Sequence, residues 1–322
     1  MERKLAEMPA LIDDLLVLDG LSRAGKFLLG KIASNFKRVE YFQYPPLMEQ
    51  IPYLYKMGMM EKQVAVAYLK INANMSCYDM GIGRGLNTRE NDGSSILNST
   101  DKNYYFQREK DPDGNLAIEK MKKEKRIPSV LTHEVLPLID LYLEAFPAVK
   151  FLNIQRHPID LISSWFLRGL GERFGSDPLT FTPTFQGNGC SMPWFAMGWE
   201  KEYETYTPLN RVAKSILTIA ELEQEALLKL NKKERTQVHL ICYENLFSQP
   251  DKEIADMGSF LNDSPHSNMS EVLKREGCVE PVSLDSRREK LSKMEGDLLP
   301  ELREKLLEYS RKYEELWSLE AL

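Results

Sequence analysis

The chain has 322 residues, of which 43% are apolar and 28% are charged, and its formal net charge is −6. This balance is that of an average globular protein with a substantial core, so it excludes a disordered chain, and the mild acidity argues against a general coat for nucleic acid. The apolar runs fall far short of the roughly 18–20 residues that span a bilayer, and the first residues lack the pattern of a secretory signal. Four widely spaced cysteines have no spacing for metal or disulfides. We therefore expect a cytoplasmic protein with no metal and with neither a membrane nor a nucleic acid as partner; its oligomeric state is left open.

Short apolar runs alternate with helical patterns along the chain. The runs expected as strands cover residues 15–20, 38–44, 127–132, 149–155 and 236–243. Helices are expected over residues 26–36, 48–58, 61–73, 136–146, 159–167 and 298–322. Strands that alternate with helices form parallel βαβ units, so this pattern predicts an α/β fold with a doubly wound, mainly parallel sheet flanked by helices.

Two segments break the alternation. Residues 72–126 are rich in Gly, Asn, Asp and Lys, and residues 169–199 combine Gly and Pro with many aromatic side chains. Loops of this length inside a compact domain are usually functional or disordered. We expect a single domain over residues 1–322 that carries these two segments as insertions.

The strongest local signal lies between the first strand and the first helix, at residues 20–27 (GLSRAGKF). Glycines allow a tight turn whose N–H groups point at an anion, the helix start adds partial positive charge, and Arg23 and Lys26 add full charges. The spacing is that of the G-x-x-x-x-G-K nucleotide loop, but Phe27 stands where that loop has the hydroxyl that binds Mg²⁺. A phenyl ring cannot bind a metal, so the segment predicts a phosphate site without one. The alternative is an ordinary Gly-rich turn with two surface cations.

A second cluster follows the fourth expected strand. Arg156 lies at the carboxyl edge, where open α/β sheets bind ligands, and Ser164 lies about two helical turns further on, where it can face the same crevice. A guanidinium and a hydroxyl suit a second phosphate. The alternative gives Arg156 a structural salt bridge and places Ser164 on the helix surface.

Taken together, these segments resemble the PAPS-dependent sulfotransferases, whose donor is 3′-phosphoadenosine 5′-phosphosulfate (PAPS). The family's 5′-phosphosulfate loop has a cation, a small residue and a glycine, which is similar to residues 23–25, and its 3′-phosphate motif is similar to Arg156 and Ser164. The family's Tyr-Glu-Asp-Leu strand end is similar to residues 243–246, which would put Tyr243 by the adenine. The resemblance implies a P-loop NTPase-like fold of the sulfotransferase type. The donor site that it implies consists of Ser22, Arg23, Ala24, Gly25, Lys26, Phe27, Arg156, Ser164 and Tyr243.

Sulfuryl transfer to a hydroxyl needs a base for the acceptor proton and cations on the leaving phosphate. His133 ends the third expected strand, near the position where soluble members of the family carry Lys-Thr-His with the His as base. Leu131 replaces that Lys, so Arg23 or Lys26 would supply the charge. Glu134 is the alternative base, because carbohydrate-directed members often use a carboxylate.

The family closes its 3′-phosphate pocket with a late basic segment, and Arg287 or Arg288 would serve here; otherwise such a charge run is a solvated face. The insertions 72–126 and 169–199 would form the acceptor side. Aromatic faces in the second insertion suit a sugar ring or a lipophilic alcohol.

The resemblance therefore implies transfer of a sulfuryl group from PAPS to the hydroxyl or amine of a small-molecule or saccharide acceptor. The product nucleotide would be adenosine 3′,5′-bisphosphate (PAP), and no metal would be required. One alternative is an ATP-dependent P-loop kinase of small molecules, for which residues 20–26 suffice but which leaves Arg156 and Ser164 without a role. The other is a nucleotide-binding module without catalysis.

Overall fold

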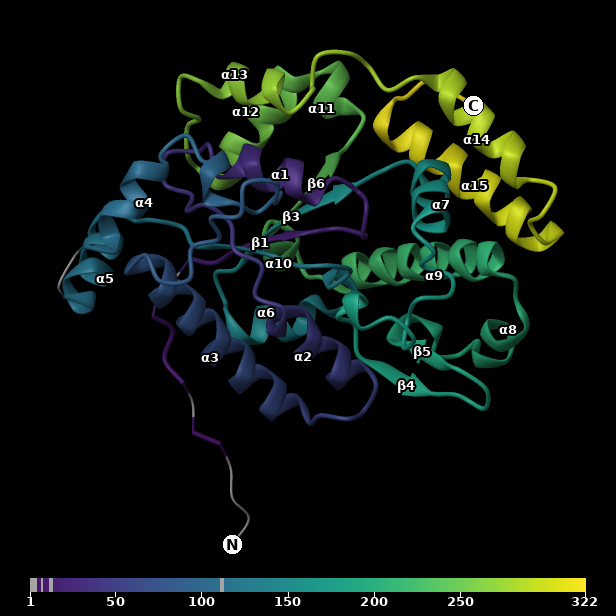
Figure 1. The fold of residues 1–322 in the computed structure, drawn as a ribbon, viewed down its shortest axis with the longest axis horizontal. Coiled ribbons are helices and arrows are strands. Elements are labelled where there is room, and N and C mark those ends of the chain that lie inside the picture. The colour runs from purple at the N-terminus through teal and green to yellow at the C-terminus, as the bar shows by residue number, and fades with distance from the viewer. Residues whose placement is uncertain (1–4, 7, 12–13, 111–112) are drawn as a thin grey trace, which may run out of the picture.

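The centre of the molecule is a sheet of four parallel strands (Figure 1). The computed structural model describes residues 5–6, 8–11, 14–110 and 113–322. The strands are β1 (Leu16–Asp19), β2 (Ser129–Leu131), β3 (Lys150–Gln155) and β6 (Val238–Cys242), in the spatial order β2-β1-β3-β6. Every side chain of β1 and β2 is buried, as is typical of parallel strands covered on both faces.

The direction of winding reverses at the middle of this sheet. The chain passes from β1 outward to β2 and then returns across β1 to β3, so that Leu18 pairs with Leu131 on one side and with Leu152 on the other. Ligands of open α/β sheets bind beyond the carboxyl ends of the strands at such a reversal. The segments that follow β1 and β3 therefore meet at the crevice that the topology creates.

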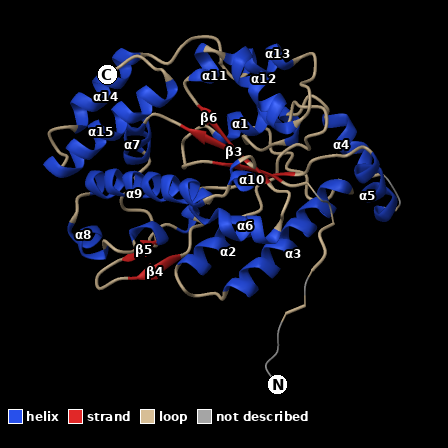
Figure 2. Cartoon of the chain, turned by 180° about the vertical axis from the view of Figure 1, so that it is seen from behind, coloured by secondary structure: helices blue, strands red, loops and turns tan. Residues whose placement is uncertain are grey.

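Helices cover both faces of the sheet, which confirms the doubly wound α/β prediction (Figures 1 and 2). One face carries α1 (Lys26–Ala33), α11 (Asn245–Ser248), α12 (Pro250–Leu261) and α13 (Met269–Arg275). The other carries α2 (Leu47–Lys56), α3 (Lys62–Gly81), η2 (Leu136–Leu138), α6 (Ile139–Ala145) and α9 (Pro208–Lys229). After β3, α7 (Pro158–Leu167) packs against α9 and against the C-terminal helices α14 (Leu284–Met294) and α15 (Pro300–Trp317). The short α10 (Lys232–Arg235) leads into β6.

Residues 72–126 are not a long loop, because more than half of them are helical. Helix α3 continues to Gly81, and η1 (Ile96–Asn98), α4 (Lys102–Arg108) and α5 (Gly114–Lys123) follow it. Their polar side chains pair inside the fold: Arg108 and Arg126 hold the buried carboxylate of Glu40 at 2.8 and 2.6 Å. A helix that buries charged side chains in ion pairs lacks the regular apolar spacing by which helices are predicted from a sequence.

Residues 38–44 also differ from the strand expected there. They touch the edge of β2 only through isolated bridges, Val39 with Ile127 and Gln43 with Val130. The step from Val39 to Gln43 is one residue longer than the step on the partner segment, which interrupts a regular ladder.

The second insertion, residues 169–199, folds into short elements. These are η3 (Pro178–Thr180), the antiparallel pair β4 (Thr184–Gln186) and β5 (Ser191–Pro193), and η4 (Trp194–Ala196), with α8 (Glu200–Thr205) after them. Several of its aromatic side chains are core: Trp194 and Phe195 are at most 2% exposed. None of the helices within the described ranges is both long and apolar enough to cross a membrane.

A buried carboxyl group lies where α9 packs on the sheet. Burial, together with the charge of Asp19, raises the pKa of Glu223 well above its ordinary value. Asn153 donates its amide to Asp19 (3.2 Å), while Asn153 Oδ1 and Glu223 Oε1 are both buried without a donor. A proton on Glu223 would supply that donor, and the raised pKa means that the native state holds this proton to higher pH than the unfolded state does, although Asn153 and Lys26 oppose the rise.

Glu223→Gln should therefore stabilise the protein increasingly as pH rises above about 4.5. The native state keeps the proton that the unfolded state has lost, so wild-type stability falls with pH in this window, whereas Gln does not titrate. Urea unfolding between pH 4 and 8 measures the difference. The exposed Glu221→Gln on the same helix is the control, and an equal response of both variants would contradict the raised pKa of Glu223.

Candidate active site

The turn between β1 and α1, residues 20–25, is shaped by three residues with positive φ, of which the first, Gly20, has φ 143°. Arg23 has φ 71° and Gly25 has φ 108°. A Cβ on Gly25 would lie 2.6 Å from the ring of Tyr243, so both the backbone and the space require glycine here. Gly25 is also the N-cap of α1, and the free N–H groups of the helix start open toward the turn.

Four residues expected at the donor site converge beside this turn. Arg23 Nε donates to Ser164 Oγ (3.2 Å), and Arg156 Nη1 donates to the carbonyl of Arg23 (2.9 Å). The Arg156 guanidinium lies over the ring of Tyr243, with Cζ 4.5 Å from the centroid. Trp165 Nε1 donates to the carbonyl of Ser22 (2.6 Å) and ties α7 to the turn. The structure thus brings the ends of β1, β3 and β6 together around one spot.

This cluster is positively charged, and one of its buried hydrogen-bond donors has no partner among the described residues. Partial burial and the charges of Arg168 and Arg156 lower the pKa of Arg23. Arg156 Nε is buried without a hydrogen-bond partner, and no carboxylate within the described ranges forms an ion pair with Arg23, Arg156 or Arg168. Since a buried donor without a partner is costly, the arrangement suits an anion.

Lys26 corrects the expectation that its ammonium faces the bound anion. The residue is 4% exposed, and Nζ donates to the carbonyls of Gly20 (2.9 Å) and Leu21 (2.8 Å) beneath the turn. Burial lowers its pKa, while the carboxylates of Glu134 and Asp19 oppose that shift. The Lys26 ammonium therefore stabilises the turn by binding two of its carbonyls.

Its neighbour Phe27 is 40% exposed and packs edge-on against Phe42. The part of the chain that the structure describes contains no cluster of three or more side chains able to hold a metal ion.

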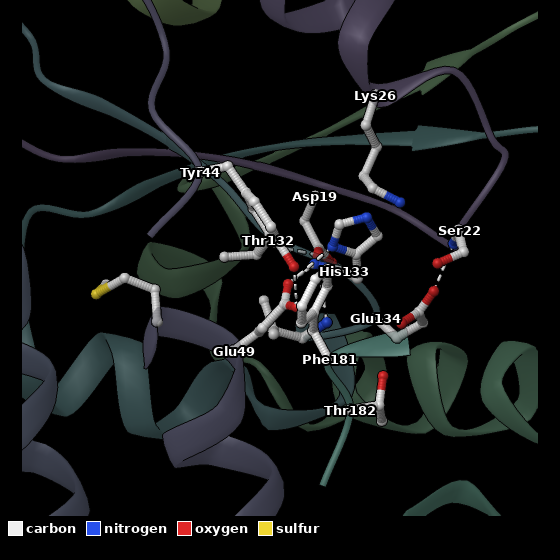
Figure 3. A network of polar contacts seen from close by, with 12 residues as sticks. Asp19, Ser22, Lys26, Tyr44, Glu49, Thr132, His133, Glu134, Phe181 and Thr182 are labelled. Atoms are coloured by element: carbon white, nitrogen blue, oxygen red, sulfur yellow. Dashed lines mark hydrogen bonds and ion pairs between the residues drawn. The ribbon is translucent and has the colours of Figure 1, made fainter. Parts of the chain in front are cut away.

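His133 is held by a glutamate that the sequence did not single out (Figure 3). Glu49 Oε2, from α2, lies 2.8 Å from both Nδ1 and the backbone N of His133, while Glu49 Oε1 accepts the Tyr44 hydroxyl (2.8 Å). Hydrogen bonding to a carboxylate makes Nδ1 the protonated nitrogen and leaves Nε2 as the acceptor. In Figure 3 this second nitrogen points away from Glu49. No local pattern could have revealed Glu49 or Tyr44, because only the tertiary structure brings α2 and the segment that ends at Tyr44 beside His133.

Glu134 has a different place. It has a left-handed backbone (φ 48°), is 6% exposed, and accepts a short hydrogen bond from the N–H of Ser22. Burial raises its pKa, and the charge of Lys26 opposes this rise. The carboxyl group therefore braces the turn, and of the two expected bases His133 is the more accessible, with 22% of its side chain exposed.

A cavity of about 320 Å³ lies between the turn and His133. Its walls include Phe174, Phe181 and Phe195 of the insertion 169–199. No described residue of 72–126 is among its lining. A larger hollow of about 810 Å³, between α2, α6 and α9, contains none of the expected site residues.

Arg287 also departs from expectation. It is 4% exposed, and its Nη2 lies 3.0 Å from Asp160 and 3.2 Å from Glu244. These two carboxylates occupy the guanidinium, which anchors α14 to α7 and to the end of β6. Arg288 is half-exposed, and among the described residues it pairs only with Asp285 on its own helix.

His157, beside this network, has Nε2 3.1 Å from Glu314 of α15. Burial lowers the pKa of His157 to about 3, so it is neutral at pH 7.

No protein-family model and no curated protein matches the chain. Among solved structures it is similar to the sulfotransferase domain from the curacin biosynthetic pathway, with 12% identity and a TM-score of 0.48 over 98% of this chain and 100% of that one. It is also similar to the sulfotransferase domain of the Synechococcus olefin synthase (12%, TM-score 0.42, 93% and 100%). A third is a sulfotransferase from Alicyclobacillus acidocaldarius (16%, TM-score 0.36, 89% and 98%). Likenesses of this size do not establish a family.

Arg287→Ala should destabilise the protein by about 3 kcal/mol, because it leaves the buried Glu244 without its cation and leaves Asp160 with Lys290 alone. The neighbouring Arg288→Ala should change stability by less than about 0.5 kcal/mol, since its partner is exposed. Denaturant unfolding at neutral pH compares the two. Equal stabilities would contradict the anchoring role of Arg287.

Proposed function

We propose that this protein is a sulfotransferase that moves a sulfuryl group from PAPS to a hydroxyl acceptor. The observation that carries the proposal is the convergence of Arg23, Arg156, Ser164 and Tyr243 beside the turn, next to a cavity that contains His133.

The donor carries two anionic groups and one aromatic base, and the cluster offers a partner for each. The turn and Arg23 suit the 5′-phosphosulfate, because N–H groups and a guanidinium are charge-assisted donors to its oxygens. Arg156 and Ser164 suit the 3′-phosphate, and the unpartnered Nε of Arg156 supports this role. The ring of Tyr243, at the edge of the same cluster, suits the adenine.

The transfer step depends on the part of the site that contains His133 and Glu49. His133 Nε2 takes the proton of the acceptor hydroxyl as its oxygen forms a bond to sulfur. The bond from sulfur to the bridging oxygen breaks, and the electron pair leaves with the 5′-phosphate of PAP, whose growing charge Arg23 and the turn stabilise. Glu49 orients the ring and stabilises the imidazolium that forms.

The rival proposal, an ATP-dependent kinase, is supported only by the spacing of the turn. The loop has Phe27 at the position where a kinase needs a hydroxyl to bind Mg²⁺. A kinase would also give no role to Arg156 and Ser164, which lie against the turn. A binding module without catalysis would leave the pairing of His133 with Glu49 unexplained.

PAP without metal should stabilise the protein by about 2.7 kcal/mol at roughly 100 times its dissociation constant. Arg156→Ala should lose most of this stabilisation, because it removes the guanidinium of the 3′-phosphate site. Thermal unfolding with and without PAP measures both effects, with the surface variant Arg303→Ala as control. Stabilisation by ATP and Mg²⁺ alone would overturn the sulfotransferase in favour of the kinase.

His133→Gln should lower kcat by about 100-fold or more and leave the binding of PAP unchanged, because it removes the base and not the donor site. Sulfate transfer from PAPS to a panel of alcohols and phenols measures this, and His266→Gln, in a loop, is the matched control. A loss of kcat in Glu134→Gln as large as that in His133→Gln, with PAP binding intact, would move the base to Glu134.

A further inference from the structure

Three arginines line the cavity beside His133, and the guanidinium of one of them has no partner within the described residues. The three are Arg23, Arg168 and Arg173. Arg173 is occupied, with Nε 2.7 Å from Asp177 and Nη1 bonded to the carbonyl of Arg168 (3.1 Å). Arg168, at the end of α7, is exposed, and its guanidinium has no hydrogen bond or ion pair within the described ranges. Its charge is near enough to lower the pKa of Arg23.

The carboxylates of the cavity do not neutralise these guanidiniums. Glu49 is engaged by His133 and Tyr44, and Glu134 is engaged by the N–H of Ser22. If the donor's two anionic groups occupy Arg23 and Arg156, Arg168 still faces the cavity without a counter-charge. Arg168 is then available to an anionic group of the acceptor.

Another part of the cavity lining is apolar and partly exposed. Phe174 packs edge-on against Phe195 with centroids 5.4 Å apart, which fixes an inner aromatic surface. Leu179 and Phe181 form the outer edge and are 67% and 57% exposed. The carbonyl of Phe181 accepts a hydrogen bond from Gln50 of α2 (2.8 Å), which holds this edge over the cavity. Two large apolar side chains exposed at a cavity mouth suit an apolar ligand.

We infer that the acceptor is an amphipathic hydroxy acid, with its carboxylate on Arg168, its apolar body against Phe174 and Phe181, and its hydroxyl at His133. The assignment of the hydroxyl as the reacting group rests on the proposed function. A cavity of about 320 Å³ holds a compact body of this kind, such as a phenolic acid or a short hydroxyalkanoic acid.

The test compares hydroxyphenylpropionate with its methyl ester, which differ in the charged group and little in shape. Calorimetry with saturating PAP, which fills the donor site, should show that wild type binds the acid about tenfold more tightly than the ester. Arg168→Gln should remove this preference by weakening the acid alone, and Phe181→Ala should weaken both ligands. Arg303→Gln, on the exposed face of α15, is the matched control and should keep the preference.

Equal binding of acid and ester by wild type would overturn the inference while leaving the proposed function intact. A loss of PAP binding in Arg168→Gln as large as in Arg156→Ala would also overturn it, because Arg168 would then belong to the donor site. The same titrations without nucleotide separate the two proposals. An acid preference that depends on Arg168, in a protein that does not bind PAP, would refute the proposed function and keep the acid site.

Discussion

The contact between the ring of Tyr243 and Gly25 is the constraint on which the rest of the site depends. Any side chain at position 25 would collide with the ring, so the turn after β1 and the end of β6 can pack only through a glycine. The same ring supports the Arg156 guanidinium, which in turn holds the carbonyl of Arg23. One aromatic face therefore joins the ends of three strands into a single rigid cluster at the reversal of the sheet.

Charge is organised locally, against the overall composition. The chain has a net charge of −6, yet the carboxylates near the crevice are all engaged in holding structure. Asp160 and Glu244 share Arg287, Glu49 orients His133, and Glu134 braces the turn. Within the described residues, Arg23, Arg156 and Arg168 have no such carboxylate partner. The capacity of the crevice to bind an anion therefore depends on which carboxylates already have partners. A count of charges cannot show this.

Burial explains why two cationic residues of the expected site have other tasks. Lys26 and Arg287 stand at positions where a pattern favours contact with phosphate, but their side chains point into the protein and are satisfied there. The reverse holds for Glu49 and Arg168. Nothing adjacent in the sequence distinguishes them from other charged helix residues, and their importance comes from the side chains that the fold places around them.

The sequence by itself determined the parallel strands, most of their helices, and the turn, because these depend on local periodicity, glycine geometry and the rule that strand ends share an edge. It also predicted that Arg23, Arg156, Ser164 and Tyr243 lie together, since each sits at the carboxyl edge of the sheet or on the helix that follows it. Only the tertiary structure decided which charges are free, which helices form within residues 72–126, and what orients His133. Those outcomes depend on burial and on partners far away in the chain, and a one-dimensional pattern carries neither.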